Sequence, residues 1–208
     1  CKQLTEVIIN APEFTMESNT FGIMSGVKPA MTIYVVNAEM KAYVESKLTS
    51  DAKNYITVKA PAVVTDKASL QAEMAKAIKA GEKNIYIDAT NFSGDLNNGF
   101  SNGNLPAGVT VTVRNAKVTA TSKWNYLNGT LIFENCEFTA GLYSIHFDDN
   151  DGVGDVIFKN CKLVGWLPFS AINSVSFENC HLTGNGSYAL IRSYADLTLK
   201  NCVIDTTL

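Results

Sequence analysis

The sequence is poor in the residues on which many functional sites depend. Only two of its 17 basic residues are arginines, Arg114 and Arg192, and it has only two histidines. Arginine is the residue best suited to bind phosphate or carboxylate through paired hydrogen bonds, so such recognition has few candidates here. With 20 acidic residues the net charge is −3. No nucleic-acid partner is therefore expected, since proteins that bind nucleic acids usually carry a basic patch.

Long apolar runs are also missing. No stretch approaches the ~20 residues that a transmembrane helix needs, so no transmembrane segment is expected. The composition, 46% hydrophobic and 18% charged, is that of a globular protein. The chain begins with Cys1, which resembles the lipid-modified first residue of an exported bacterial surface lipoprotein; the alternative is that the numbering simply starts there. We expect an exported protein, anchored at the cell surface through Cys1 or extracellular.

An eight-residue repeat runs through the second half of the chain. Four copies align without gaps on the pattern apolar-x-apolar-x-Asn-Cys-x-apolar: Leu131–Phe138, Val156–Leu163, Val175–Leu182 and Leu197–Ile204. A fifth copy has Ala116 in place of Cys, and a weaker sixth has Ala89 in place of Asn. From residue 89 onward, the Asn positions are 26, 20, 25, 19 and 22 residues apart. This period is too short for a solenoid of helices.

The repeat predicts both strands and a corner. Alternation of apolar and other residues indicates a short strand with one buried face. The alternation breaks at Asn and resumes one residue later, so the chain must bend there, and Asn tolerates left-handed backbone better than most residues. We expect the asparagines to stack as a ladder: Asn115, Asn135, Asn160, Asn179 and Asn201. Free thiols would stack inside as small apolar groups: Cys136, Cys161, Cys180 and Cys202.

A coil of about 22 residues with three short strands resembles the pectate-lyase-like superfamily, in which the period of the repeat is one turn. The resemblance covers roughly residues 84–208. It implies a mainly β chain with a right-handed parallel β-helix of about five to six coils. Such proteins often carry an N-terminal capping helix, and residues 66–80 fit one, with Asp66 as its cap and Gly81 as its stop. The last copy ends at Ile204 without a cap. Its end could be covered by the last residues, by more chain or by another copy.

Residues 1–62 lack the repeat. Thr32–Val36 and Tyr55–Val58 are predicted strands, and Asn37 can cap a helix that runs between them to about Thr49. We interpret residues 1–62 as a small α+β module or an extension of the cap. Residues 63–208 then form the β-helix with its capping helix.

One acidic loop is a candidate metal site. Asp149, Asp151 and Asp155 could offer oxygens to Ca²⁺, which prefers carboxylates and carbonyls. The alternative is a polar surface turn, because Asp, Asn and Gly are common turn residues. No other cofactor is expected.

The outer face of one sheet is the candidate ligand site. His146 lies between Ile145 and Phe147, so alternation points it outward. The candidate ligand-binding residues are Trp124, Tyr126, His146, Asp148 and Arg192. Other aromatic residues on the same side of the coil are Tyr143, Trp166, Tyr188 and Tyr194. Exposed aromatic rings suit sugars; the alternative is that these rings pack under loops.

Three functions remain open, because the fold hosts lyases, hydrolases, esterases and adhesins. The first is a non-catalytic surface or secreted protein that binds glycan or another cell-surface partner. The second is a lyase or hydrolase of acidic polysaccharide. The third is a structural stalk or assembly module that associates end to end. One exposed histidine and one arginine are too few to assign catalytic roles, which favours the first.

Overall fold

The computed structural model describes residues 4–18, 20–21, 30–96, 105–120, 122–124, 127–140, 142–147, 153–170, 172–186 and 189–205. The chain divides into two compact units, residues 1–61 and residues 62–208. In the described part of the chain, no helix has the length and apolar character to cross a bilayer.

The first unit is a small parallel sheet with one helix. Its strands pair in the order β1-β2-β3: β1 (Glu6–Ile9), β2 (Met31–Val35) and β3 (Ile56–Lys59). Helix α1 (Ala38–Lys47) and the short 3₁₀ helix η1 (Ala52–Asn54) connect β2 to β3. The Asn37 side chain caps α1 by accepting a hydrogen bond of 2.7 Å from the Met40 N–H. Strand β1 was not predicted, because Glu-Val-Ile-Ile shows no alternation.

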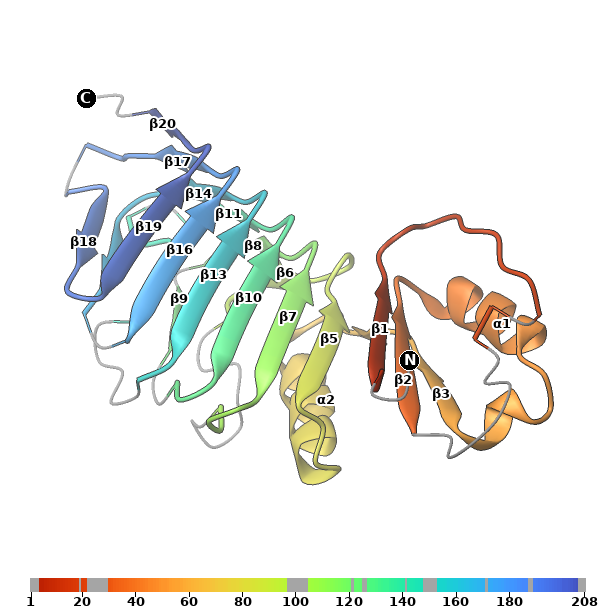
Figure 1. The fold of residues 1–208 in the computed structure, drawn as a ribbon. Helices are drawn as coiled ribbons and strands as arrows, with labels where there is room; N and C mark the ends of the chain where they lie inside the picture. Colours follow the sequence, from red (N-terminus) through yellow and green to blue (C-terminus); the bar gives the residue numbers. More distant parts are fainter. Residues whose placement is uncertain are drawn as a thin grey trace. The chain divides into compact units, whose positions relative to one another are not determined.

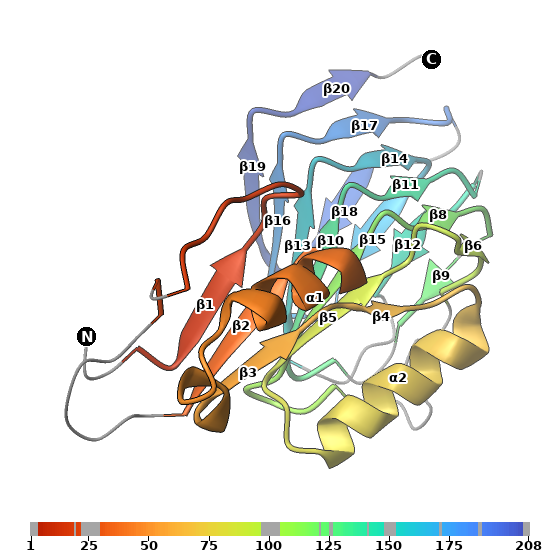
Figure 2. The same cartoon turned by 90° about the vertical axis from the view of Figure 1, so that its right-hand side faces the viewer.

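The second unit begins with an amphipathic helix. Helix α2 (Lys67–Lys79) starts at Asp66, whose side chain accepts the Ser69 N–H at 2.7 Å, and this hydrogen bond lowers the pKa of Asp66. Gly81 follows with φ 79°, a conformation that favours glycine. Leu70 and Met74 are fully buried in the core of this unit. Figures 1 and 2 show α2 lying beside β4 and β5, at one end of the stacked strands.

Parallel sheets make up the rest of the unit, in agreement with the mainly β prediction. The largest pairs β4 (Ala62–Val63), β5 (Asn84–Asp88), β7 (Thr110–Arg114), β10 (Thr130–Glu134), β13 (Asp155–Lys159), β16 (Ser174–Glu178) and β19 (Asp196–Lys200), in that order. A second sheet pairs β6 (Ser93–Gly94), β8 (Lys117–Val118), β11 (Glu137–Phe138), β14 (Lys162–Val164), β17 (His181–Thr183) and β20 (Val203–Asp205). On a third side, β9 (Ser122–Lys123) pairs with β12 (Ile145–His146), and β15 (Leu167–Phe169) pairs with β18 (Ile191–Ser193).

Equivalent residues of successive repeats stack inside the unit. The rings of Phe133 and Phe158 are 5.3 Å apart at 18°, and those of Phe158 and Phe177 are 4.9 Å apart at 7°. All three side chains are fully buried. Burying a phenylalanine stabilises the fold by roughly 1.5–3 kcal/mol, so this column is a main source of its stability.

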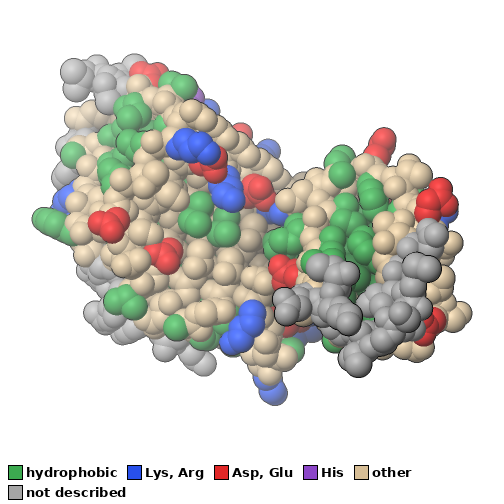
Figure 3. Space-filling model, in the orientation of Figure 1, with side chains coloured by type: hydrophobic (Ala, Val, Ile, Leu, Met, Phe, Trp, Pro, Cys, Tyr) green, Lys and Arg blue, Asp and Glu red, His purple; other side chains and the backbone are tan. Residues whose placement is uncertain are grey.

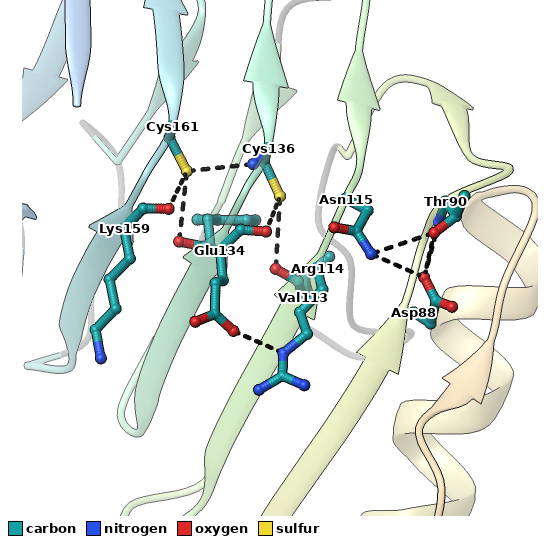
Figure 4. A network of polar contacts seen from close by, with 10 residues as sticks. Asp88, Thr90, Val113, Arg114, Asn115, Glu134, Cys136, Lys159 and Cys161 are labelled. Carbon is teal, nitrogen blue, oxygen red and sulfur yellow. Dashed lines mark hydrogen bonds and ion pairs between the residues drawn. The ribbon is translucent and has the colours of Figure 1, made fainter. Parts of the chain in front are cut away.

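The repeat's asparagines lie where the chain turns from the first sheet to the second. Their φ angles are 53–64°, in the left-handed region, at Asn115, Asn135, Asn160, Asn179 and Asn201. The Asn179 side chain donates to Oδ1 of Asn160 at 3.3 Å. Where the sixth copy has no asparagine, Asn115 instead reaches Asp88 and Thr90, at 3.3 and 3.2 Å (Figure 4).

Four of these asparagines are followed by a cysteine with a free thiol: Cys136, Cys161, Cys180 and Cys202. Each thiol lies 3.3–3.5 Å from two backbone carbonyl oxygens, one in its own repeat and one in the repeat before. Figure 4 shows these contacts for Cys136 and Cys161. The pKa of Cys161 is raised to about 12 by its hydrogen bond with Cys136 and by its burial. Contact with Cys161 and burial also raise the pKa of Cys180. The thiols of Cys161 and Cys180 are therefore protonated at neutral pH.

Charges alternate in sign along the last outward position of the largest sheet. Adjacent strands place these residues in register: Asp88, Arg114, Glu134, Lys159, Glu178 and Lys200. Two of the pairs are close ion pairs of 2.6 Å, Arg114 with Glu134 and Lys200 with Glu178. The hydrogen bond from Lys200 lowers the pKa of Glu178. Figure 3 shows basic and acidic side chains next to each other on this face. We call this row the charge ladder.

Candidate functional site

The candidate ligand site lies on the third side of the second unit, which is formed by β9, β12, β15 and β18. The two strand pairs on this side are adjacent, because the Phe147 N–H after β12 donates a hydrogen bond of 3.1 Å to the Pro168 carbonyl of β15. On this side Lys123 lies beside His146, and Arg192 lies beside Pro168, which is buried. Adjacent strands are ~4.8 Å apart, so these positions form a row about 14 Å long.

Aromatic rings connect the basic residues of this row. The Arg192 guanidinium lies 4.8 Å from the centre of the Trp166 ring, within the range of a cation–π interaction. Trp166 contacts Tyr143 with ring centres 5.2 Å apart, and Tyr143 contacts His146 at 5.7 Å. Arg192 is exposed, and the three rings are partly exposed. We call His146, Tyr143, Trp166 and Arg192 the aromatic–basic strip.

Backbone and buried polar contacts fix the strip. Tyr143 and Trp166 form a parallel bridge, which holds the two rings on adjacent levels. Ser144 is fully buried, and its hydroxyl donates to the carbonyl of Val164 at 2.5 Å. The Asn185 side chain donates to the carbonyl of Leu142 at 3.0 Å, so a residue 43 positions away supports the turn before Tyr143. Residues from several repeats therefore hold the strip in place, rather than the residues of a single loop.

Trp124 was wrongly predicted to be an exposed ligand residue. It is fully buried, with its ring stacked on Phe147 at 6.5 Å and edge-on to Phe133 at 6.3 Å. The strand places Lys123 outward beside His146, so Trp124 points inward with Phe147. A shift of one residue in the alternation moves every side chain to the opposite face. Lys123, which the sequence did not single out, takes the outward position.

The remaining candidates separate into two groups. His146 and Arg192 lie in the strip, with partly exposed and exposed side chains. Tyr126, Asp148, Asp149, Asp151 and Cys1 lie outside the described residues. The hypotheses of a lipid anchor and of a Ca²⁺ loop therefore stay predictions, as does that of a polysaccharide-degrading enzyme.

Asp155, the described member of the proposed calcium set, has a structural role. Its Oδ1 accepts hydrogen bonds from the Ser174 hydroxyl at 2.6 Å and from the Asn173 amide at 2.8 Å. Both donors belong to the next repeat, so Asp155 links adjacent levels. Among the residues that the structure describes, no group of three or more His, Cys, Asp or Glu side chains is placed to hold a metal ion.

Comparison of the chain with protein-family models, curated proteins and solved structures gives no match.

Proposed function

We propose that residues 62–208 form a right-handed parallel β-helix of the kind found in the pectate-lyase-like superfamily. The support is the order of the strands: the chain visits the three sides in turn, and each strand pairs in parallel with its equivalent one repeat later. Crossover connections between parallel strands are right-handed in about 98% of cases, which favours the same hand here.

We further propose that this β-helix is a non-catalytic, exported surface module that binds acidic glycans through the aromatic–basic strip. The observation that carries the proposal is Arg192 above Trp166, in a row with Tyr143 and His146. Few arginines are present in the chain, and one of the two is placed on an aromatic row at the surface.

The residue types in the strip match the two kinds of surface that a uronate sugar has. Aromatic rings offer flat apolar faces on which the C–H groups of a sugar can pack. An arginine guanidinium has five N–H donors and can bind a carboxylate through two of them. The cation–π interaction with Trp166 engages the positive charge from one face, and the donors lie in the guanidinium plane. Lys123, on the neighbouring level to His146, adds positive charge at the other end of the row.

Tryptophan fluorescence offers a direct test. The chain has two tryptophans; Trp124 is fully buried and Trp166 is partly exposed in the strip, so a ligand on the strip changes the Trp166 emission. The protein would be titrated with oligogalacturonates and with neutral galactose oligomers of the same length. We expect binding of the acidic oligomers, weakened by added salt because exposed charges are screened.

Variants locate the site. Arg192→Ala should weaken binding of the acidic oligomer by about 10- to 100-fold, since hydrogen bonds to charged groups contribute about 1.5–3 kcal/mol. Because Trp166→Ala removes the fluorescent reporter, it would be measured by calorimetry. Tyr194→Ala is the matched control, as Tyr194 is 79% exposed and is not part of the strip. Equal binding of neutral oligomers, no binding of acidic oligomers at about millimolar concentration, or an equal loss in the Tyr194 variant would each contradict the proposal.

A further inference from the structure

The strand β19 ends the largest sheet and leaves one edge open. It pairs with β16 alone among the described strands. Its inward residues Leu197 and Leu199 are 43% and 42% exposed, whereas their partners in β16, Val175 and Phe177, are fully buried. Figure 3 shows hydrophobic side chains at this end of the unit. Open strand edges with exposed apolar residues are sites of pairing with another chain.

The backbone of β19 shows which groups face that edge. The Asp196 N–H donates to the Asn173 carbonyl, and the Lys200 carbonyl accepts from the Asn179 N–H. In a parallel ladder, the groups that face one neighbour belong to alternate residues. Asp196, Thr198 and Lys200 therefore use their backbone groups toward β16. The N–H and C=O groups of Leu197 and Leu199 point to the open edge.

We propose that β19 pairs antiparallel with β19 of a second copy, around a two-fold axis at Thr198. The strand reads Asp196-Leu-Thr-Leu-Lys200, and this sequence is complementary to itself when reversed. Asp196 then lies opposite Lys200 of the second copy, and Leu197 lies opposite its Leu199. The two leucine pairs are the hydrogen-bonded pairs and make four backbone hydrogen bonds; the Thr198 pair is non-hydrogen-bonded.

The charge ladder favours the same arrangement. It ends at Lys200, which has an acidic neighbour, Glu178, on one side only. The proposed pairing places Asp196 of the second copy on the other side, so the alternation of sign continues across the axis. Shifting the register by two residues removes both charge pairs and leaves only one self-paired leucine in register.

A two-fold contact closes after two copies. The same patch serves both partners, so the open edge of β19 is fully used within the dimer. Stacking head to tail would pair β19 with β4 at the opposite end of the sheet. Strand β4 has only two residues, and α2 packs on the core at that end, so the five residues of β19 have no matching partner there. This inference goes beyond the glycan proposal and does not depend on it, because the strip and β19 use different residues.

Disulfide trapping tests the geometry. Thr198→Cys would be made in a Cys1→Ser, Cys202→Ser background. Opposite residues of a non-hydrogen-bonded pair have Cα atoms about 4.5 Å apart, within disulfide range. We expect a covalent dimer under mild oxidation. Ser176→Cys is the matched control: Ser176 holds the same position one strand inward, next to Thr198, and should stay monomeric.

Light scattering and charge exchange complete the test. The unmodified chain should have the mass of a dimer. Asp196→Lys should weaken the dimer by about tenfold or more, since two opposite-charge pairs become like-charge pairs. Lys200→Asp should do the same, and mixing the two variants should restore a dimer, because both cross-strand pairs then join opposite charges. The proposal would be overturned if the protein were a monomer at about 100 µM, a concentration well above a micromolar dissociation constant for the dimer. Open-ended oligomers, or equal disulfide trapping at position 176, would also overturn it.

Discussion

The corner asparagines allow the backbone and side-chain contributions to the repeat to be separated. Asn160 has φ 53°, and its Oδ1 accepts the Asn179 amide at 3.3 Å. Left-handed backbone costs an ordinary residue roughly 1–2 kcal/mol, and Asn less. The hydrogen bond adds about 0.5–1.5 kcal/mol, at the low end because it is exposed. Asn160→Ala should therefore lower the free energy of unfolding by about 1.5–2 kcal/mol.

Glycine at the same position separates the two effects. Asn160→Gly loses the hydrogen bond but adopts left-handed backbone without strain, although it gains entropy in the unfolded chain. We expect a loss below about 1 kcal/mol, and so a difference of about 1 kcal/mol between the two variants. Asn128→Ala is a control at an exposed asparagine whose φ is not positive, with an expected change within about 0.5 kcal/mol.

Urea denaturation followed by tryptophan fluorescence measures these values for one unit. Both tryptophans, Trp124 and Trp166, belong to residues 62–208, so the signal reports that unit. The midpoint should move while the slope with denaturant stays constant. If glycine destabilises as much as alanine, the left-handed backbone is not what selects asparagine at this corner, and the reasoning fails.

Four other changes should have distinct effects. Phe158→Ala should lower the free energy of unfolding by about 3–5 kcal/mol in the same assay, because it leaves a cavity between two stacked rings. Gly154→Ala should destabilise by roughly 1–3 kcal/mol or more, since its Cβ would lie 2.3 Å from a backbone oxygen. With Cys1 replaced, a thiol reagent at pH 8 should modify the partly exposed Cys202 quickly and Cys161 only on unfolding; fast reaction of Cys161 would contradict its burial and raised pKa. The lowered pKa of Asp66 stabilises the fold above the ordinary carboxyl pKa of about 3.9, and this contribution is lost as the pH falls through the folded-state pKa. Asp66→Ala should therefore reduce the acid sensitivity of folding, which stability measurements between pH 2 and 6 would show.

The sequence predicts the local features of the fold and those contacts between repeats that follow from the repeat itself, such as the Asn160–Asn179 contact, but not the contacts outside the repeated motif. The corner at each asparagine follows from a break in alternation within eight residues, and the caps at Asn37 and Asp66 follow from neighbouring residues. The burial of Trp124 depends on its register with β12. The neighbouring residues Ser122 and Lys123 are both polar, so the local pattern does not mark which side of the strand faces the core.

The candidate site depends on contacts between distant residues. Trp166 and Arg192 are 26 positions apart in the sequence and meet only because β15 and β18 pair in register. The sequence placed both on the same side of the coil but gave no signal that they would touch. Lys123 could have been found from its alignment with His146 one repeat later, had the phase of the third strand been clear.

The charge ladder also has a consequence for how the chain finds its strand order. The repeats share one apolar pattern, so burial alone hardly distinguishes a strand's true neighbour from the strand after it. The signs of the charges distinguish these two neighbours. Pairing β10 with β16 would place Glu134 against Glu178, and pairing β7 with β13 would place Arg114 against Lys159. Like charges directly opposite each other destabilise a sheet. The charge ladder therefore disfavours strand pairings that skip one repeat during folding, because such a pairing brings charges of the same sign together.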